Sequence, residues 1–275
     1  MASPLTELLN PDVRWRLGTA GYAYPDWRSS FYPRGTPQSG WLKAYAERFP
    51  AVEMNTTFHA LPDAERLRRW VEQVPADFRF SVKVGRQVTH DTPIDRAGPY
   101  LDQFCQGMAP LLPRLGPLLL QFPPTFEFSS FEDLRKLLQR IPSSFPFAVE
   151  VRHPSWLRSE TWSLLKEYRA AFVSLDHDDH PEFQVVRPTG PLLYNRLIGK
   201  HGRYDSDREE QYDPTINLMA WQDRLGQADL TEVKEIWVIF SNDYAGHAPA
   251  TLRRFAELAG VVLPEQHLAR QKTLF

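Results

Sequence analysis

The sequence predicts an α/β fold, a single (β/α)₈ barrel of the TIM type. Short apolar segments alternate with segments of helical periodicity along nearly all of the 275 residues, and the alternation occurs eight times. Repeated strand–helix units build a parallel sheet, and eight of them close into a barrel. No linker rich in Pro, Gly or Ser divides the chain, so we expect one domain. An open doubly wound sheet is the structural alternative.

The expected strands are short runs rich in Val, Ile, Leu and aromatic residues, which suit a buried, pleated strand. In chain order they comprise residues 15–19, 51–55, 78–84, 117–122, 147–152, 171–176, 192–197 and 236–241. The longest irregular insert, residues 198–213, follows the seventh strand. We therefore expect a barrel over residues 15–260, after an N-terminal extension of residues 1–14 and before a flexible C-terminal tail of residues 261–275.

The expected helices lie between these strands and carry apolar residues three and four positions apart, which places those residues on one helix face. They comprise residues 40–49, 63–74, 100–115, 131–141, 155–168, 214–225 and 248–259. Asp63, Ser130 and Ser155 stand where side chains commonly cap a helix N-terminus. In this order, the helices connect consecutive parallel strands.

Composition favours a soluble cytoplasmic protein. A hydrophobic fraction of 42% allows a large core. The net charge of −2 gives no global signal for nucleic acid, so binding of nucleic acid would need a local basic patch. Cys105 is the only cysteine, which excludes an internal disulfide and a cysteine-cluster zinc site. No apolar run approaches the length of a membrane span and residues 1–14 show no secretory leader, so no membrane partner is expected.

The chemistry of the barrel is expected at the carboxyl ends of its strands, where the active sites of TIM barrels lie. Side chains alternate along a strand, and we place the polar side of each strand on the barrel axis. This inward set comprises Glu53, Asn55, Ser81, Lys83, Gln121, Glu150, Arg152, Ser174, Asp176, Tyr194, Arg196 and Asn242. Six of these residues are expected to converge on one pocket: Glu53, Lys83, Glu150, Arg152, Asp176 and Arg196.

The expected pocket sets three acidic side chains against three basic ones. Arg152 and Arg196 offer the fork geometry that holds a phosphate or carboxylate by two hydrogen bonds, and Lys83 adds a third cation. The expected catalytic residues are Glu53, Glu150, His153 and Asp176. A glutamate would act as general base, with His153 or His90 as acid. The alternative is that the six charges pair with one another in a purely structural network.

The loop after the first strand is rich in aromatic residues, of which Tyr22 and Tyr24 are expected to reach a ligand. The expected ligand-binding set is Tyr22, Tyr24, Asn55, Lys83, His90, Gln121, Arg152, Arg196 and Asn242. No metal is expected, because the interleaved Lys and Arg neutralise the carboxylates that a divalent ion would need. No cofactor is expected, since the chain contains no Walker loop, nucleophile elbow or dinucleotide fingerprint.

A set of short motifs runs from about residue 16 to residue 260. They read GTAGY (18–22), FYP (31–33), VEMNTTF (52–58), FRFSVK (78–83), TH (89–90), LLLQFPP (118–124), VEVRHPSW (149–156) and FSN (240–242). Together they resemble the YecE-like family, catalogued as domain of unknown function 72, and the resemblance implies a TIM-type barrel without a settled activity. The chain departs from the family where His59 replaces a tyrosine, and where Ile198 replaces the histidine of an Arg-x-His-Gly pattern.

The chain ends in Gln-Lys-Thr-Leu-Phe. A Gln three residues before a terminal Leu-Phe pair resembles the peptide by which bacterial DNA polymerases and repair proteins dock on the sliding clamp. We therefore expect Gln271, Leu274 and Phe275 to bind that clamp. The alternative is a tail that packs on its own barrel.

Three hypotheses for function remain open. The first is a DNA repair or replication factor whose mouth binds an anionic, phosphate-containing ligand such as nucleic acid, and which acts as a phosphodiester hydrolase. The second is a small-molecule hydrolase of a sugar or phosphate ester that uses Glu53 and Glu150. The third is a binding module without catalytic activity. The clamp-like tail favours the first hypothesis, whereas the nearly neutral net charge weakens it.

Overall fold

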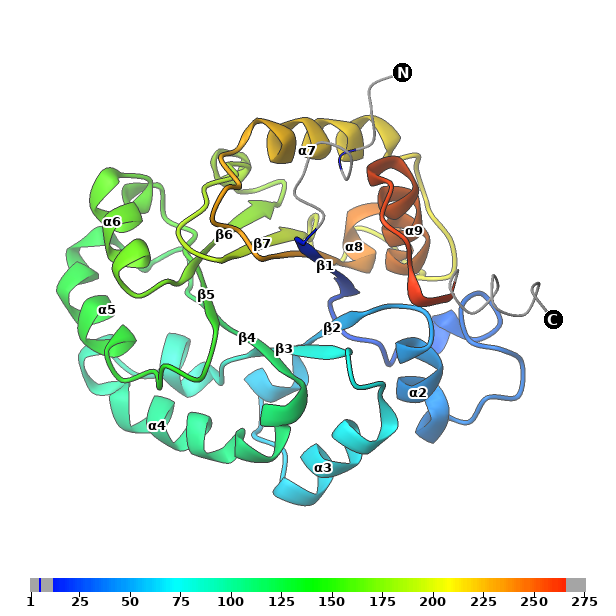
Figure 1. Cartoon of the computed structure of the whole chain (residues 1–275), viewed down its shortest axis with the longest axis horizontal. Coiled ribbons are helices and arrows are strands. Elements are labelled where there is room, and N and C mark those ends of the chain that lie inside the picture. The colour runs from blue at the N-terminus through cyan, green and yellow to red at the C-terminus, as the bar shows by residue number, and fades with distance from the viewer. Residues whose placement is uncertain (1–4, 6–11, 266–275) are drawn as a thin grey trace.

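Eight parallel strands form the centre of the computed structural model, which describes residues 12–265 and Leu5 (Figure 1). The strands are β1 (Arg14–Thr19), β2 (Ala51–Met54), β3 (Arg79–Lys83), β4 (Leu115–Gln121), β5 (Phe147–Glu150), β6 (Ala171–Asp176), β7 (Leu192–Leu197) and β8 (Glu235–Phe240). They pair in the order β1-β8-β7-β6-β5-β4-β3-β2. The predicted fold class, a single-domain (β/α)₈ barrel, is confirmed.

The two ends of this sheet, β1 and β2, meet near the barrel mouth and nearly close the barrel. Ala20 and Glu53 form an isolated parallel bridge there, and the N–H of Gly21 donates to the carbonyl oxygen of Glu53 at 2.8 Å. Gly18 permits this approach, because a Cβ on it would lie 2.5 Å from the carbonyl oxygen of Ala51. The closure therefore places Glu53 at the seam of the barrel.

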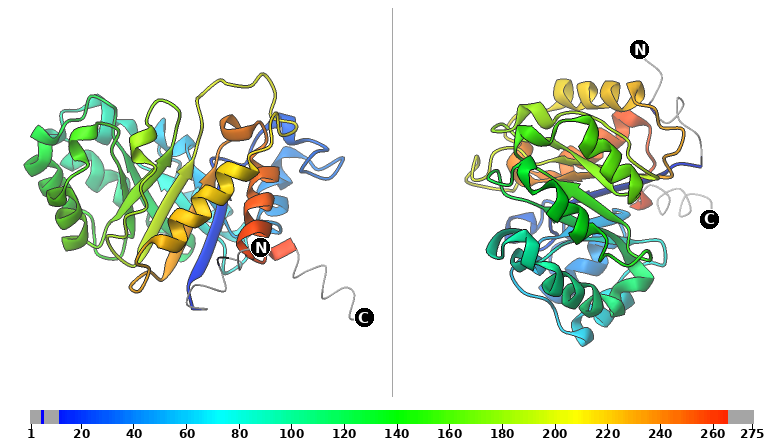
Figure 2. Two further views of the ribbon diagram at one scale, coloured as in Figure 1. Left: turned by 90° about the horizontal axis from the view of Figure 1, so that it is seen from above. Right: turned by 90° about the vertical axis from the view of Figure 1, so that its left-hand side faces the viewer.

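Helices surround the strands in all three ribbon views (Figure 1 and Figure 2). They are α2 (Trp41–Ala46), α3 (Ala64–Gln73), α4 (Gly98–Gly107), α5 (Phe131–Leu138), α6 (Ser159–Glu167), α7 (Thr215–Gln227), α8 (Asn242–Ala245) and α9 (Ala248–Ala259). Asp63 caps α3 as predicted, by accepting the N–H of Arg66 at 2.7 Å. Ser130 stands at the predicted N-cap position of α5, but its side chain makes no capping bond. The cap at Ser155 was wrong, because α6 begins at Ser159 after a separate short turn.

Large and small side chains together fill the barrel interior. Trp237 of β8 is fully buried and stacks on Tyr194 of β7, with ring centroids 5.8 Å apart. Gly116 of β4 provides the space for this indole, because a Cβ on Gly116 would lie 2.5 Å from the Trp237 ring. Toward the N-terminal ends of the strands, Arg16 is 2% exposed and forms an ion pair with Asp77 at 3.1 Å. The interior is therefore a packed core below the mouth.

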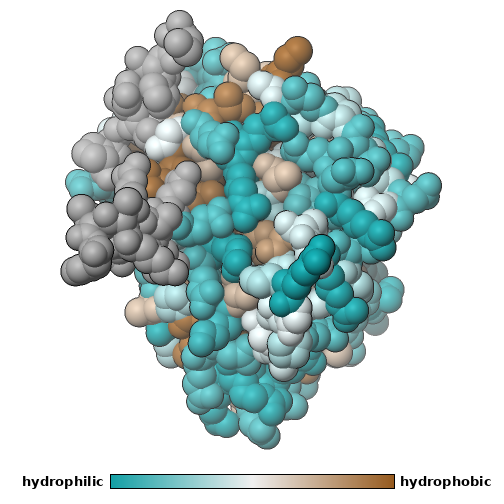
Figure 3. Space-filling model, turned by 90° about the vertical axis from the view of Figure 1, so that its right-hand side faces the viewer, coloured by the Kyte–Doolittle hydropathy of each residue, from teal (hydrophilic) through white to brown (hydrophobic). Residues whose placement is uncertain are grey.

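The outer surface is mainly hydrophilic on the face drawn in Figure 3. Ile216 and Met219 are the apolar side chains that α7 exposes most, at 81% and 51%. Among the residues that the structure describes, no helix is long and apolar enough to cross a membrane.

Candidate functional site

Four charged side chains form a continuous chain of ion pairs just inside the mouth. Arg196 of β7 binds both carboxylate oxygens of Glu53 on β2, from Nη2 to Oε1 at 2.8 Å and from Nε to Oε2 at 2.9 Å. Its Nη1 donates to Oε2 of Glu150 on β5 at 2.5 Å, and Nε of Arg152 donates to Oε1 of Glu150 at 2.7 Å. We call Glu53, Arg196, Glu150 and Arg152 the charge chain. Its two carboxylates have no exposed surface.

Tyr194 supports the charge chain from inside the barrel. Its hydroxyl lies 3.0 Å from Oε2 of Glu53 and 2.6 Å from Oγ of Ser81. Burial, and next the charge of Glu53, raise the pKa of Tyr194 well above its ordinary value, so the hydroxyl keeps its proton. Every carboxylate oxygen of the charge chain thus has at least one donor, which a buried charge requires.

The electrostatics of the charge chain favour the ionised forms of Glu150 and Arg196. Burial opposes the ionisation of Glu150, but the charges of Arg196 and Arg152 outweigh it and lower the pKa of Glu150 to about 2. Burial likewise opposes the charge on Arg196, but Glu150 and Glu53 raise its pKa above the ordinary value. Two acids and two bases therefore cancel, and the charge chain is neutral.

Lys83, at the end of β3, is the cation that the charge chain leaves without a carboxylate partner. Its Nζ lies 4.0 Å from the centre of the Phe58 ring, and in the described part of the chain no carboxylate oxygen lies within 4.0 Å of it. Burial, and next the charge of Arg196, lower the pKa of Lys83 to about 8. Added to a neutral charge chain, a protonated Lys83 gives the cluster a net positive charge.

On β6 the side chains face the opposite way from the prediction. Oδ2 of Asp176 accepts from Nε1 of Trp221 on α7 at 2.6 Å and from the hydroxyl of Tyr244 on α8 at 2.9 Å. Its Oδ1 accepts from Nε2 of Gln184 at 2.7 Å. Asp176 therefore faces the surrounding helices and does not converge with Glu53. The prediction was wrong because helix side chains supply the polar partners that we expected on the barrel axis.

His177 takes the inward place that we assigned to Asp176. Leu175 pairs with Arg196 in the parallel register, so Leu175 and the residue two positions later share the inward side. His177 is 8% exposed, and its Nδ1 accepts the N–H of Asp179 at 3.1 Å, which leaves the proton of the neutral imidazole on Nε2. Burial, and next the charge of Arg152, lower the pKa of His177.

His90 completes a group of nitrogen bases at one side of the mouth. Its ring meets the Phe58 ring edge-on at 5.0 Å, and its Nδ1 lies 2.8 Å from Oγ1 of Thr89. Burial, and next the charges of Lys83 and Arg152, lower the pKa of His90. We call Lys83, His90, Arg152 and His177 the cationic half of the mouth.

Three other predicted site residues bond to nearby parts of the fold. Nδ1 of His153 accepts the N–H of Ser155 at 3.3 Å and so caps the short helical turn before α6. Nε2 of Gln121 donates to the next carbonyl oxygen along the chain at 2.6 Å. Oδ1 of Asn242 accepts from Nε1 of Trp27 at 3.2 Å. His153 and Asn242 are thus held by structural bonds, and neither contacts the charge chain through any of these bonds.

A cavity of about 430 Å³ opens over Arg196 at the other side of the mouth. Its polar lining includes Tyr24, Asn55, His201, Asp207, Asn242 and Asp243. Oδ1 of Asn55 is buried there without a hydrogen-bond partner in the described structure. Burial, and next the charges of Asp243 and Asp26, raise the pKa of Asp207. We call Tyr24, Asn55, Asp207 and Asp243 the acidic half of the mouth.

The acidic half contains two carboxylates, those of Asp207 and Asp243. Within residues 12–265, no group of three or more His, Cys, Asp or Glu side chains is arranged to hold a metal ion. Tyr24 donates its hydroxyl proton to the carbonyl oxygen of Ala20, and Tyr22 lines an adjoining cavity of about 200 Å³ that also contacts Asn55. Both predicted tyrosines therefore lie at the mouth, Tyr24 within the acidic half and Tyr22 beside it.

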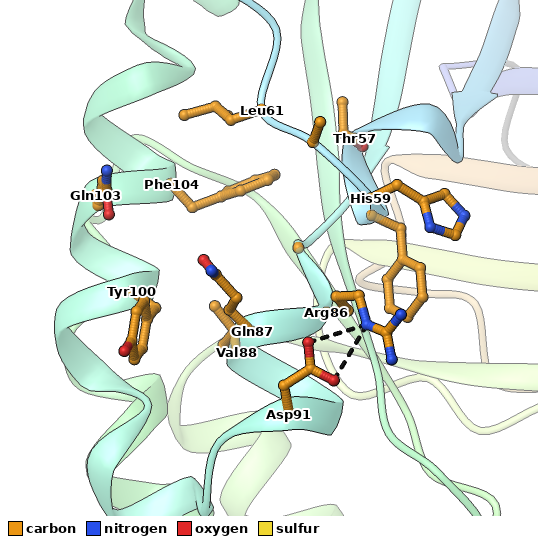
Figure 4. Close-up of a pocket in the computed structure, with 13 residues that line it drawn as sticks. Thr57, His59, Leu61, Arg86, Gln87, Val88, Asp91, Tyr100, Gln103 and Phe104 are labelled. Carbon is orange, nitrogen blue, oxygen red and sulfur yellow. Dashed lines mark hydrogen bonds and ion pairs between the residues drawn. The ribbon is translucent and has the colours of Figure 1, made fainter.

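A separate cavity of about 300 Å³ lies outside the mouth, between α4 and the turn that follows β3 (Figure 4). Leu61, Tyr100 and Phe104 form apolar walls, and Arg86 pairs with Asp91 at 2.9 Å beside them. No member of the charge chain lines this cavity. We therefore place the candidate site at the mouth, where charge and burial coincide.

Solved structures of known proteins share this fold. A DUF72 family protein from Enterococcus faecalis V583 is similar with a TM-score of 0.69 and 25% identity, and the match covers 91% of this chain and 99% of that one. A DUF72 family protein from Thermotoga maritima MSB8 is similar with a TM-score of 0.66 and 27% identity, covering 90% of this chain and 99% of that one.

Sequence comparison leads to the same group. The UPF0759 protein YunF of Bacillus subtilis (strain 168) is 27% identical over 271 residues, which cover 89% of this chain and 94% of YunF. The UPF0759 protein YecE of Escherichia coli (strain K12) is 39% identical over 115 residues, so the match spans only 42% of the length of either chain. The family described as "Protein of unknown function DUF72" matches residues 16–273. The chain therefore belongs to the DUF72 family, which includes the YecE-like UPF0759 proteins.

Proposed function

We propose that the protein binds a small phosphate- or carboxylate-bearing ligand at the barrel mouth, with the anionic group on the cationic half. The observation that carries this proposal is the uncompensated charge of Lys83 beside a charge chain that is already neutral. A partly buried ammonium group without an ion-pair partner is unfavourable unless a bound anion pairs with it. Arg152 uses Nε for Glu150, and its terminal amino groups can serve a ligand.

The acidic half indicates what the rest of the ligand contains. Asp207, Asp243 and Oδ1 of Asn55 are acceptors, so they suit the hydroxyl or amino groups of a ligand. The two halves are joined by direct contacts, from Arg196 under the cavity through Glu150 to Arg152. A polyhydroxylated compound with one anionic group, such as a sugar phosphate or a sugar acid, matches this polarity. The cavity of about 430 Å³ is lined by the acidic half and Arg196 but by no member of the cationic half, so it would hold the hydroxylated part of such a ligand.

Hydrolysis is the weaker proposal for this site. A general base must be able to accept a proton at the working pH. Both oxygens of Glu150 accept from arginines, and the pKa of Glu150 of about 2 makes it a weak base near neutral pH. We therefore assign Glu150 and Glu53 to holding Arg196 and Arg152 in place. Hydrolysis of a phosphodiester or a sugar ester would need a base from elsewhere in the mouth. The same holds for a role in DNA repair that depends on such hydrolysis.

Replacing Lys83 by Gln should weaken the binding of inorganic phosphate by about tenfold to a hundredfold, which corresponds to one charge-assisted hydrogen bond. The measurement is isothermal titration calorimetry at low ionic strength. Affinity for phosphate in the unmodified protein should also fall as the pH rises through about 8, because Lys83 then loses its proton.

The matched control is Lys200→Gln, since Lys200 is exposed and pairs with Asp179 at 3.4 Å. It should leave phosphate affinity unchanged. Undetectable phosphate binding by the unmodified protein, or equal affinities of the two variants, would count against the cationic half as an anion site. Lys83→Gln removes no ion pair of the described structure, so a folding defect is not expected to confuse the result.

We propose separately that the C-terminal residues dock on the bacterial sliding clamp. Gln271, Leu274 and Phe275 lie outside the described residues, and the support is their sequence alone. A short linear peptide gives modest affinity, about micromolar, because it loses conformational entropy on binding.

Removal of residues 271–275 should abolish binding of purified clamp in a surface plasmon resonance titration. A Leu274→Ala, Phe275→Ala variant should do the same, and Lys272→Ala should serve as a control with little effect. Equal clamp binding by the complete and shortened chains, or no binding by either, would exclude this partner.

A further inference from the structure

We propose that Lys83 is a covalent nucleophile that forms a Schiff base with the carbonyl group of an aldehyde or ketone that also carries a phosphate or carboxylate. The inference rests on the proposed function, because it places the anionic group on Arg152 of the cationic half and the carbonyl carbon at Nζ of Lys83. It goes further by assigning a reaction and a chemical class of substrate to the same mouth.

The first argument is that the two arginines of the charge chain already bind all the oxygens of its two buried carboxylates. Arg196 occupies both oxygens of Glu53, and Arg196 and Arg152 occupy one oxygen each of Glu150. No acidic partner remains to hold Lys83 as a permanent ammonium. A lysine placed only for structure would normally end on one of these carboxylates, as the buried arginines do.

The second argument is the surroundings of Nζ. Lys83 packs against the face of Phe58. Burial and the charges of Arg196 and Arg152 lower its pKa, and together they outweigh the opposite effect of Glu150 and Glu53. Desolvation and neighbouring cations are the two means by which proteins convert a lysine into a nucleophile. With a pKa of about 8, Lys83 holds roughly a hundred times more free amine at pH 8 than a lysine of ordinary pKa.

The third argument concerns the groups available for proton transfer. His90 and His177 belong to the cationic half, and the lowered pKa of each keeps a neutral imidazole near pH 7. A neutral imidazole can both donate and accept a proton. His90, whose pKa the charge of Lys83 helps to lower, can therefore move protons between the amine and the carbonyl oxygen, a role that Glu150 with its low pKa cannot take.

The reaction balances without any other reagent. The lone pair of the neutral Nζ attacks the carbonyl carbon, the C–N bond forms, and the carbonyl oxygen becomes a hydroxyl group. The two amine hydrogens and that oxygen then leave as water, while the C=N bond of the imine forms. Protonation of the imine makes it an electron acceptor for cleavage or isomerisation next to the former carbonyl.

The test uses the full-length protein and two probes that combine a carbonyl with an anion, pyridoxal 5′-phosphate and the smaller glyoxylate. Each is added at limiting concentration at pH 8, the imine is reduced with sodium borohydride, and labelled lysines are located by peptide mass spectrometry. At least one probe should label Lys83 at least tenfold more than the exposed Lys200 and Lys136. Added inorganic phosphate should suppress the labelling of Lys83 and leave the other lysines unchanged.

Pyridoxal without its phosphate separates the inference from the proposed function. If phosphate binds by calorimetry but Lys83 is labelled no more than Lys200 by either probe, the Schiff base is overturned and the anion site stands. If pyridoxal labels Lys83 as strongly as its phosphate ester does, and phosphate does not compete, the anion site is overturned instead.

Discussion

Replacement of Arg196 by Met should lower the free energy of unfolding by about 3–5 kcal/mol, the usual cost of leaving a buried charge without its partner. Arg196 makes three hydrogen bonds to Glu53 and Glu150, two carboxylates with no exposed surface. Methionine has a similar length and flexibility, so the lost packing should be a minor part of the effect. Urea denaturation followed by tryptophan fluorescence measures the change.

The matched control is Arg69→Met on α3. Arg69 pairs with Glu65 at 2.9 Å, but their side chains are 56% and 76% exposed, and such pairs contribute at most about 1 kcal/mol. A similar loss of stability in the two variants would show that the buried ion pairs of the charge chain contribute no more to stability than an exposed pair does. An Arg196→Lys variant should recover part of the loss, because it restores the charge without the bidentate geometry.

Acidification provides a second readout of the same substitution. The folded-state pKa of Glu150, about 2, lies below its ordinary value of 4.5. The stability that Glu150 contributes is therefore fully present above about pH 4.5 and is lost as the pH falls through about 2. Arg196→Met removes one of the two cations that lower this pKa. The variant should thus lose less stability on acidification, and the difference between the two proteins should narrow below about pH 4.

The fold was predictable because the strand pattern is strong in every unit. Strands such as β6 and β7 are mostly apolar and buried along nearly their whole length, as a parallel sheet covered on both faces requires, and their observed bounds agree with the prediction. Helix starts were less predictable. Ser155 was placed at a helix start, but Pro154 and the capping His153 make a separate turn first, and the sequence carries no clear sign of which turn continues.

The site was partly predictable, and the failure at β6 shows why. Strand alternation correctly brought Glu53, Glu150 and Arg196 together, because each is the sole charged residue within its strand's apolar run. On β6 both Asp176 and His177 are polar, so alternation alone cannot choose between them. Trp221 of α7, which lies 45 residues after Asp176 in the chain, donates a hydrogen bond to Asp176 and so fixes its side chain on the helix side of β6. The pairing of Val173 with Tyr194, which fixes the side of β6 that faces the barrel axis, could not be deduced from the sequence.

Replacement of Trp237 by Ala should lower the free energy of unfolding by about 3–5 kcal/mol, as expected for the loss of a fully buried aromatic side chain. The indole fills the barrel interior, stacks on Tyr194 and occupies the space that Gly116 leaves open. Because Tyr194 in turn contacts Glu53, loosening of this layer should also weaken phosphate binding. Trp237→Phe should keep the stacking and cost less.

A double-mutant cycle tests whether the indole and Gly116 are matched in shape. Alone, Gly116→Ala should cost about 1–3 kcal/mol, because its Cβ would lie 2.5 Å from the Trp237 ring in a packed interior. In the Trp237→Ala protein that ring is gone, and of the three atoms nearest to the new Cβ the carbonyl oxygen of Phe80, at 3.1 Å, remains. The second substitution should then be nearly neutral, with a coupling of at least about 1 kcal/mol. Additive effects would mean that the barrel interior relaxes around either change, and that the packed layer beneath the charge chain is not rigid.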